Sequence, residues 1–101
     1  MAQFMKVAML KDLPAGSAMA VEVAGKSLAL YNVGGTVYAT DNTCPHRGGP
    51  LGEGDLEEGI VTCPWHAFQY DVKSGKCLTN AALSVPCHAV RLDGDNVLVE
   101  V

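Results

Sequence analysis

Basic residues are scarce in this sequence, and long apolar runs are absent. Only 7 residues are Lys or Arg, against 11 Asp and Glu, and the formal net charge is −4. A nucleic-acid-binding domain would carry a basic stripe, so we expect no nucleic-acid partner. No apolar run approaches the roughly 18 residues that span a bilayer, so we expect no membrane association. Residues 1–9 lack the apolar stretch of an export signal, which predicts a cytoplasmic protein.

Aromatic and charged residues are also few, at 6% and 18%, but the hydrophobic fraction reaches 49%. That fraction is ample for a packed core and excludes a disordered chain. A length of 101 residues suits one compact domain and is too short for two. We therefore expect a single domain over residues 1–101, acting as a monomer.

Short apolar runs separated by turn residues dominate the chain. The runs cover residues 6–10, 18–23, 27–33, 36–40, 67–72, 89–92 and 97–101. Gly34-Gly35, Ser74-Gly75 and residues 93–96 separate neighbouring runs and predict hairpin turns. The only helical turn we expect is brief and opens at Asp12. The pattern predicts an all-β fold, a small antiparallel sandwich or barrel.

Residues 42–66 interrupt this pattern. Glycine and proline are too frequent there for regular structure, at positions 45, 48, 49, 50, 52, 54, 59 and 64. A loop of this length inside a small domain is usually functional or disordered. Because metal-binding residue types bracket it, we expect functional loops inserted into the β scaffold.

Two cysteine–histidine pairs lie in this stretch. Cys44-Pro45-His46 is followed sixteen residues later by Cys63-Pro64-Trp65-His66. Each pair offers one thiolate and one imidazole on a turn that proline makes rigid. Two thiolates and two imidazoles suit a soft or borderline transition metal and not Ca²⁺ or Mg²⁺. Cys44, His46, Cys63 and His66 are therefore the predicted metal ligands.

The order of the ligands favours iron over zinc. Common zinc signatures pair Cys with Cys and His with His, whereas Cys and His alternate here. In a two-iron cluster with mixed ligands, one iron takes both cysteines and the other both histidines, which fits the alternation. A zinc-stabilised binding module without redox activity is the alternative. A Cys–His nucleophilic dyad is disfavoured because no third orienting residue stands out.

The pattern C-x-H-x₁₆-C-x-x-H, with Gly48-Gly49-Pro50-Leu51 after the first pair and Asp71 and Gly75 after the second, resembles soluble bacterial Rieske ferredoxins. The resemblance implies a Rieske-like β fold with a loop-built cluster-binding subdomain and one [2Fe–2S] cluster per chain. It implies a one-electron carrier between a flavin-dependent reductase and a terminal oxygenase, as in multicomponent aromatic-ring dioxygenases.

That resemblance also implies an electron-transfer component and not an enzyme. An oxygenase needs a mononuclear iron site with two histidines, and only His88 remains once the cluster ligands are assigned. The alternative within the family is a small Rieske subunit of a larger redox enzyme, such as nitrite reductase.

Several positions near the ligands bear on the reduction potential. We expect Leu51 to shield the iron from water. High-potential family members carry a disulfide at the positions of Gly49 and Trp65, and a hydroxyl donor at that of Phe68. These departures predict a potential at the low end of the range from about −150 to +300 mV. Tyr70 stands where such members have a tyrosine that donates to a cluster thiolate, so we hypothesise that it raises the potential modestly.

The remaining features are secondary. Cys77 and Cys87 are surplus to the cluster and are expected to be free buried thiols, with a disulfide as the alternative. His88 should point away from Cys87 on a strand, so we expect no second metal site there. Ala67 stands where many family members have glycine, so the resemblance does not predict the backbone conformation of the loop at this position. The acidic run at 53–58 predicts a solvated loop or, alternatively, a surface that steers the chain toward a basic partner.

Overall fold

The computed structural model describes residues 3–43, 49–65, 67–80 and 82–100. Strands dominate this part of the chain and form three antiparallel sheets, of order β1-β10-β9, β2-β3-β4-β8 and β5-β6-β7. The strands are β1 (Phe4–Met9), β2 (Ala18–Val23), β3 (Lys26–Val33), β4 (Thr36–Asp41), β5 (Asp55–Glu57), β6 (Ile60–Thr62), β7 (Gln69–Asp71), β8 (Cys87–His88), β9 (Val90–Asp93) and β10 (Asn96–Glu100). The predicted all-β antiparallel fold is confirmed.

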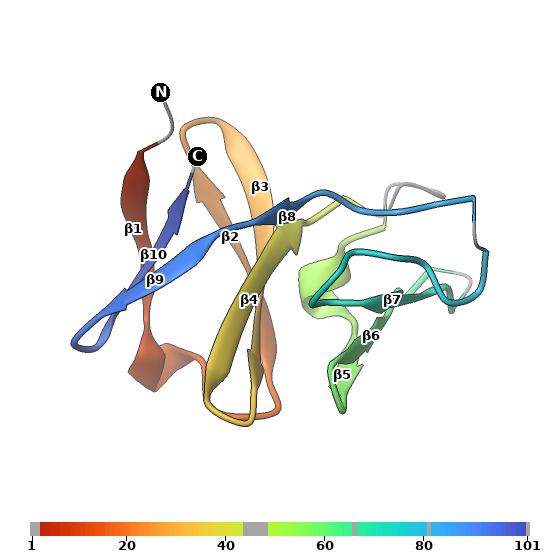
Figure 1. The fold of residues 1–101 in the computed structure, drawn as a ribbon, viewed down its shortest axis with the longest axis horizontal. Helices are drawn as coiled ribbons and strands as arrows, with labels where there is room; N and C mark the ends of the chain where they lie inside the picture. The colour runs from red at the N-terminus through yellow and green to blue at the C-terminus, as the bar shows by residue number, and fades with distance from the viewer. Residues whose placement is uncertain (1–2, 44–48, 66, 81, 101) are drawn as a thin grey trace.

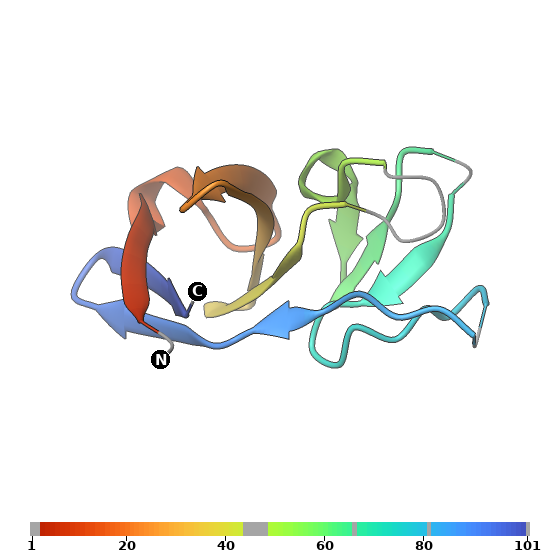
Figure 2. The ribbon, with the colours of Figure 1, turned by 90° about the horizontal axis from the view of Figure 1, so that it is seen from above.

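The first two sheets form one end of the molecule, which we call the base. Figures 1 and 2 show them facing each other at one end, with both termini nearby. Between them lies a core of aliphatic side chains, among them Leu28, Leu30, Val97 and Val99. Because these residues alternate with others along their strands, one face of each sheet covers this core.

The third sheet forms the opposite end, which we call the cluster end (Figures 1 and 2). It contains β5–β7, each only three residues long, together with the 3₁₀ turn η2 (Leu51–Glu53). Its core is separate from that of the base and includes Tyr31, Val61, Cys63 and Tyr70. The chain passes from the base into this end after β4 and returns through β8.

The expectation that residues 42–66 lack regular structure is wrong. A 3₁₀ turn and a β-hairpin lie within that stretch, because its glycines fall at turns and contacts and not inside the strands. The β5–β6 turn places Glu58 and Gly59 at φ +51° and +81°, a geometry that two-residue hairpin turns require. Two members of the acidic run, Asp55 and Glu57, therefore lie on a strand and not in a loop.

The predicted hairpin at Gly34-Gly35 is confirmed, with φ values of +60° and +101°, and so is the one between β9 and β10. Among the described residues, the chain beyond Ser74-Gly75 pairs with β7 through an isolated antiparallel bridge, Tyr70 to Cys77, and not through a longer strand. The strand predicted at 67–72 is shortened to β7 because Ala67 lies in the left-handed region at φ +58°.

The helical turn predicted to open at Asp12 instead ends there, as the 3₁₀ turn η1 (Leu10–Asp12). A second short turn, η2, was not predicted. Within the described residues, neither turn has the length or the apolar content to traverse a bilayer.

Candidate metal centre

The described residues on either side of the first predicted ligand pair meet. Thr43 and Pro50 pair in an antiparallel bridge on either side of residues 44–49. Just beyond the bridge, the Leu51 amide donates to the Asn42 carbonyl at 2.7 Å, and the Gly52 amide donates to the Asn42 side-chain oxygen at 2.7 Å. Cys44 and His46 lie outside the described residues. The hydrogen bonds bring together the described residues that flank them on either side.

The described residues that flank His66 are brought together in the same way. The Cys63 amide donates to the Phe68 carbonyl at 2.7 Å, so residues 63–68 begin and end at one point. Cys63 is only 1% exposed and belongs to the core of the cluster end. His66 lies outside the described residues, between Trp65 and the left-handed Ala67.

The two loops lie against each other at Gly49. A Cβ atom on Gly49 would lie 2.7 Å from the Cys63 Sγ and 3.0 Å from the Trp65 Cγ. The first loop therefore returns directly beside the sulfur of the second. The structure thus brings together segments that are fourteen positions apart in the sequence, and a buried thiol lies at their contact. This arrangement fits a soft metal centre shared between the two loops.

The predicted neighbours of the ligands lie around this contact. Leu51 and Tyr70 are fully buried in the same core as Cys63, whereas Trp65 is 49% exposed. Gly49 and Trp65, the positions at which the resemblance places a disulfide in high-potential members, are in contact here. The shielding of iron by Leu51 and the hydrogen bond from Tyr70 to a sulfur stay predictions.

Comparison with known proteins decides the nature of the centre. Residues 3–89 match the profile of the Rieske [2Fe–2S] domain. The chain belongs to the Rieske [2Fe–2S] domain family. The predicted family and its [2Fe–2S] cofactor are confirmed, and the zinc-stabilised module is no longer supported.

Several relatives of this Rieske chain are ferredoxins. It is 37% identical over 95 residues to the ferredoxin component of the naphthalene 1,2-dioxygenase/salicylate 5-hydroxylase systems of Ralstonia sp, covering 93% of this chain and 91% of that protein. The ferredoxin of carbazole 1,9a-dioxygenase from Nocardioides aromaticivorans IC177 is 30% identical, with 96% of each chain covered and a TM-score of 0.89.

A second solved structure, the complex of reduced oxygenase and oxidized ferredoxin in carbazole 1,9a-dioxygenase, contains a chain that is 30% identical. The match covers 95% of this chain and 91% of that one, with a TM-score of 0.88. Because these relatives are ferredoxins, the prediction of an electron carrier that is not itself a catalyst is confirmed.

Sequence reasoning missed Tyr31, a residue of β3 whose side chain belongs to the core of the cluster end. Its phenol is fully buried and lies 2.9 Å from the Thr40 hydroxyl, which in turn donates to the Asp41 carbonyl at 2.9 Å. Burial raises the pKa of Tyr31 well above its ordinary value, and the hydrogen bond to Thr40 only partly offsets that rise. The phenol is therefore a fixed neutral donor. Its place follows from the two-residue alternation of β3, which directs Ala29 and Tyr31 to one core and Leu28 and Leu30 to the other.

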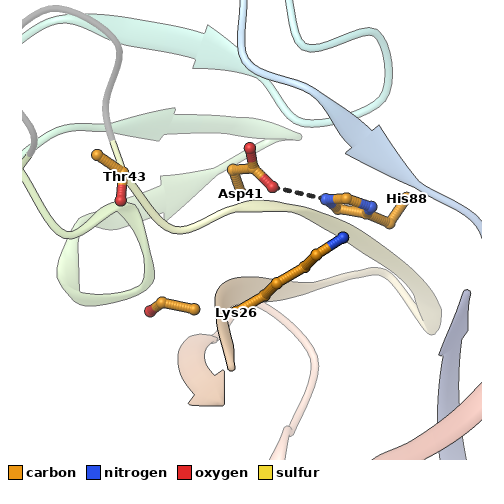
Figure 3. A pocket seen from close by; sticks show the side chains of 5 residues that line it. Lys26, Asp41, Thr43 and His88 are labelled. Atoms are coloured by element: carbon orange, nitrogen blue, oxygen red, sulfur yellow. Dashed lines mark hydrogen bonds and ion pairs between the residues drawn. The ribbon is translucent and has the colours of Figure 1, made fainter. Parts of the chain in front are cut away.

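A polar hollow lies beside the start of the first loop (Figure 3). Its volume is about 380 Å³, and Lys26, Ser27, Asp41, Thr43 and His88 line it. The His88 Nε2 donates to an Asp41 carboxylate oxygen at 2.7 Å, which ties the end of β4 to β8. Among the described residues, no three His, Cys, Asp or Glu side chains gather closely enough to hold a metal ion.

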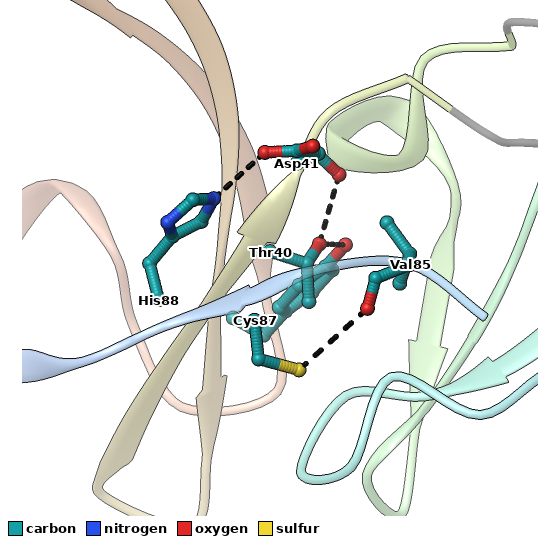
Figure 4. Close-up of polar contacts among 6 residues, drawn as sticks. Thr40, Asp41, Val85, Cys87 and His88 are labelled. Atoms are coloured by element: carbon teal, nitrogen blue, oxygen red, sulfur yellow. Dashed lines mark hydrogen bonds and ion pairs between the residues drawn. The ribbon is translucent and has the colours of Figure 1, made fainter. Parts of the chain in front are cut away.

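The two surplus cysteines differ in their surroundings. Cys77 is buried and Cys87 is exposed, and neither forms a disulfide. The expectation of free thiols is confirmed, but Cys87 is not buried because β8 is a two-residue strand at the edge of its sheet. Partial burial, helped by the carboxylates of Asp71 and Asp41, raises the pKa of the Cys87 thiol. Figure 4 shows Cys87 and His88 pointing away from each other, as alternation along a strand requires.

The acidic residues of the run at 53–58 form an exposed surface on the cluster end. Glu53, Asp55, Glu57 and Glu58 are all exposed, and the last two line a shallow hollow with Gln69. Solvation alone accounts for their positions. Steering of a basic partner stays a prediction.

Proposed function

We propose that this Rieske chain carries single electrons from a flavin-dependent reductase to the terminal oxygenase of an aromatic-ring dioxygenase system. Cys44, His46, Cys63 and His66 would hold the cluster, which when bound supplies reversible one-electron chemistry. The observation that carries this assignment is the buried Cys63 thiol at the contact of the two loops, in a chain similar to dioxygenase ferredoxins over nearly its whole length.

The chain's own residues position the site and limit its access to water. The bridge between Thr43 and Pro50 and the hydrogen bond from Cys63 to Phe68 hold the loop ends on the scaffold. Leu51 and Tyr70 fill the core beneath the loops, so water cannot reach Cys63 from that side. Positions held in advance by packing need little rearrangement when the charge of the site changes, which favours rapid electron transfer.

The acceptor half of the proposal is supported by the complex of reduced oxygenase with oxidized ferredoxin. The donor half rests on the family resemblance. Transient redox contacts are small, below about 1,200 Å² in total, so the exposed edge of one loop can be enough. The half-exposed Trp65 and exposed Pro64 lie on such an edge. The cytoplasmic location and the monomeric state stay predictions, and gel filtration of the pure protein tests the latter.

The ligand assignment is tested by replacing Cys63 and, in a separate variant, the control residue Cys77. We expect Cys63→Ser to abolish bound iron and acid-labile sulfide, because a serine hydroxyl is a poorer ligand for this site than a thiolate. Cys77→Ser is the matched control, since Cys77 is buried in the same core and lies outside the ligand motif. Iron and sulfide content, visible absorbance and EPR of the dithionite-reduced protein are the measurements. Retention of the wild-type signal in Cys63→Ser would overturn the assignment.

Electron transfer is tested with purified partners. The reductase and oxygenase of a naphthalene dioxygenase system are mixed with NADH, naphthalene and increasing amounts of this chain. We expect formation of the hydroxylated product to depend on the chain and to saturate. If the cluster-loaded chain is reduced by the reductase but supports no product, the oxygenase assignment fails. If it is not reduced at all, the donor assignment fails.

A further inference from the structure

Gly49 is required for space and not for its backbone conformation. It is buried, and its φ lies outside the left-handed region, unlike that of Gly34 or Gly75. An alanine could therefore adopt the same backbone. Its methyl group, however, would lie 2.7 Å from the Cys63 Sγ and 3.0 Å from the Trp65 Cγ. The thiol and the indole thus leave no space for a side chain at position 49.

Trp65 has a side that packs and a side that faces water. The base of its side chain lies beside Gly49, since a Cβ atom added to Gly49 would lie 3.0 Å from the Trp65 Cγ and 3.2 Å from its Cβ, yet the residue is 49% exposed. Cys63, two positions earlier, is only 1% exposed. The Cys63 sulfur and the base of the Trp65 side chain therefore lie on the same side of Gly49, which places a half-exposed aromatic residue next to a nearly inaccessible residue.

We propose that Gly49 and Trp65 form a non-covalent clasp, which joins the two ligand-bearing loops and keeps water away from the Cys63 sulfur. The inference rests on the proposed function, because it assigns these residues a role toward the cluster. Water at a ligand sulfur donates hydrogen bonds that favour the reduced, more negative state, and it also opens a route for hydrolysis of the cluster. Trp65 is therefore a positioning residue that lowers the potential of the site and lengthens its life.

The experiment compares Trp65→Ala with Trp65→Phe and with Leu78→Ala in cluster-loaded protein. Leu78 is the matched control, because it is 54% exposed and apolar but lies beside Gln69 on another segment. We expect Trp65→Ala to raise the midpoint potential and to shorten the half-life of the visible absorbance in chelator by about tenfold. Trp65→Phe should restore most of both values, and Leu78→Ala should match wild type. Equal values for Trp65→Ala and Leu78→Ala would overturn the clasp.

A second readout follows access of water to the sulfur directly. In deuterated buffer, pulsed EPR of the reduced protein should show deuterium couplings that are stronger in Trp65→Ala than in wild type. Gly49→Ala should also weaken the cluster, by forcing the loops apart. A Gly49→Ala protein that folds and keeps wild-type potential and half-life would contradict the proposed contact.

Failure of the proposed function would be recognised separately. If wild-type protein holds no iron or sulfide, that function fails, and the clasp is then tested by alkylation of Cys63 with iodoacetamide, followed by mass spectrometry. The expected result is several-fold faster modification of Cys63 in Trp65→Ala than in wild type, with Cys87 as the internal reference. Equal rates at Cys63 would overturn the clasp.

Discussion

The base and the cluster end of the molecule are built by different means. In the base, β3 has eight residues, and residues 26–31 pair with β2 while residues 28–33 pair with β4, over an aliphatic core. In the cluster end each strand of the sheet has three residues, and the core contains two tyrosines and two cysteines. Ladders of three residues supply few hydrogen bonds, and a small sheet is marginal by itself. We therefore expect the base to form unaided and the cluster end to depend on its loops and their ligand.

The two ends share strand β3 and also contact each other at Gly52. Alternate residues of β3 belong to the two cores, so this strand is a wall of both. Gly52 of η2 lies against β2, since a Cβ there would lie 2.7 Å from the Ala20 nitrogen. Damage in the base should therefore reach the cluster end, but damage in the cluster end should leave most of the base intact. This asymmetry can be tested.

Removal of the cluster should have the largest effect and should act on one end only. We expect iron chelation under reducing conditions to lower amide-exchange protection by more than about tenfold around Val61 and Tyr70, because the short ladders there lose their anchor. Protection at Leu28 and Val99 should change little. Hydrogen exchange with mass spectrometry measures both. Equal loss of protection in the two ends would show that they form one cooperative unit.

Alanine at Gly75 should be far more damaging than alanine at Gly34. Both glycines are in the left-handed region, at φ +80° and +60°, so each substitution carries a backbone penalty of roughly 1 to 2 kcal/mol. At Gly34 a Cβ meets open space, whereas at Gly75 it would overlap the Val85 carbonyl oxygen. We expect Gly75→Ala to lower the free energy of unfolding by about 3 kcal/mol or more. Urea unfolding followed by circular dichroism checks the ranking, and equal losses would contradict it.

Tyr31 should make stability fall at alkaline pH. Its pKa is raised by burial in the folded chain and is near 10 in the unfolded chain, so unfolding releases a proton above about pH 10. The contribution of neutral Tyr31 to the free energy of unfolding is complete below that pH. It is lost as the pH rises toward the folded-state pKa. The slope from this residue is up to about 1.4 kcal/mol per pH unit. We expect Tyr31→Phe to lose about 1 kcal/mol at neutral pH with its bond to Thr40, and to show a shallower alkaline decline. Urea unfolding midpoints of wild type and Tyr31→Phe between pH 8 and 11 measure this difference. An equal decline of the midpoint with pH in both proteins would contradict the prediction.

The sequence predicted the base better than the cluster end, for a physical reason. In the base, period-two alternation and turns such as Gly34-Gly35 are local signals, and they place the hairpins correctly. In the cluster end, β5 and β6 are too short to show a period, and their order depends on contacts with distant segments, such as that of Gly52 with Ala20. The ligand motif was visible because coordination restricts residue types strongly. The close approach of Gly49 to Cys63 and Trp65 is marked in the sequence by the glycine alone. The local pattern cannot show whether a glycine serves a close contact or a turn.

The smallest effect should come from relieving strain at one alanine in each end. Ala24 in the β2–β3 turn and Ala67 after His66 lie at φ +52° and +58°, where glycine is unstrained. We expect Ala24→Gly to raise the free energy of unfolding by about 0.5 to 1 kcal/mol, because relief of strain exceeds the added entropy of the unfolded chain. Ala67→Gly should leave the base unchanged and instead slow loss of the cluster, because its relief acts on the loop that carries Cys63. Unfolding of the base by circular dichroism and bleaching of visible absorbance separate the two effects. If both variants raised the free energy of unfolding of the base, or if both slowed bleaching of the cluster, the two ends would respond as one unit.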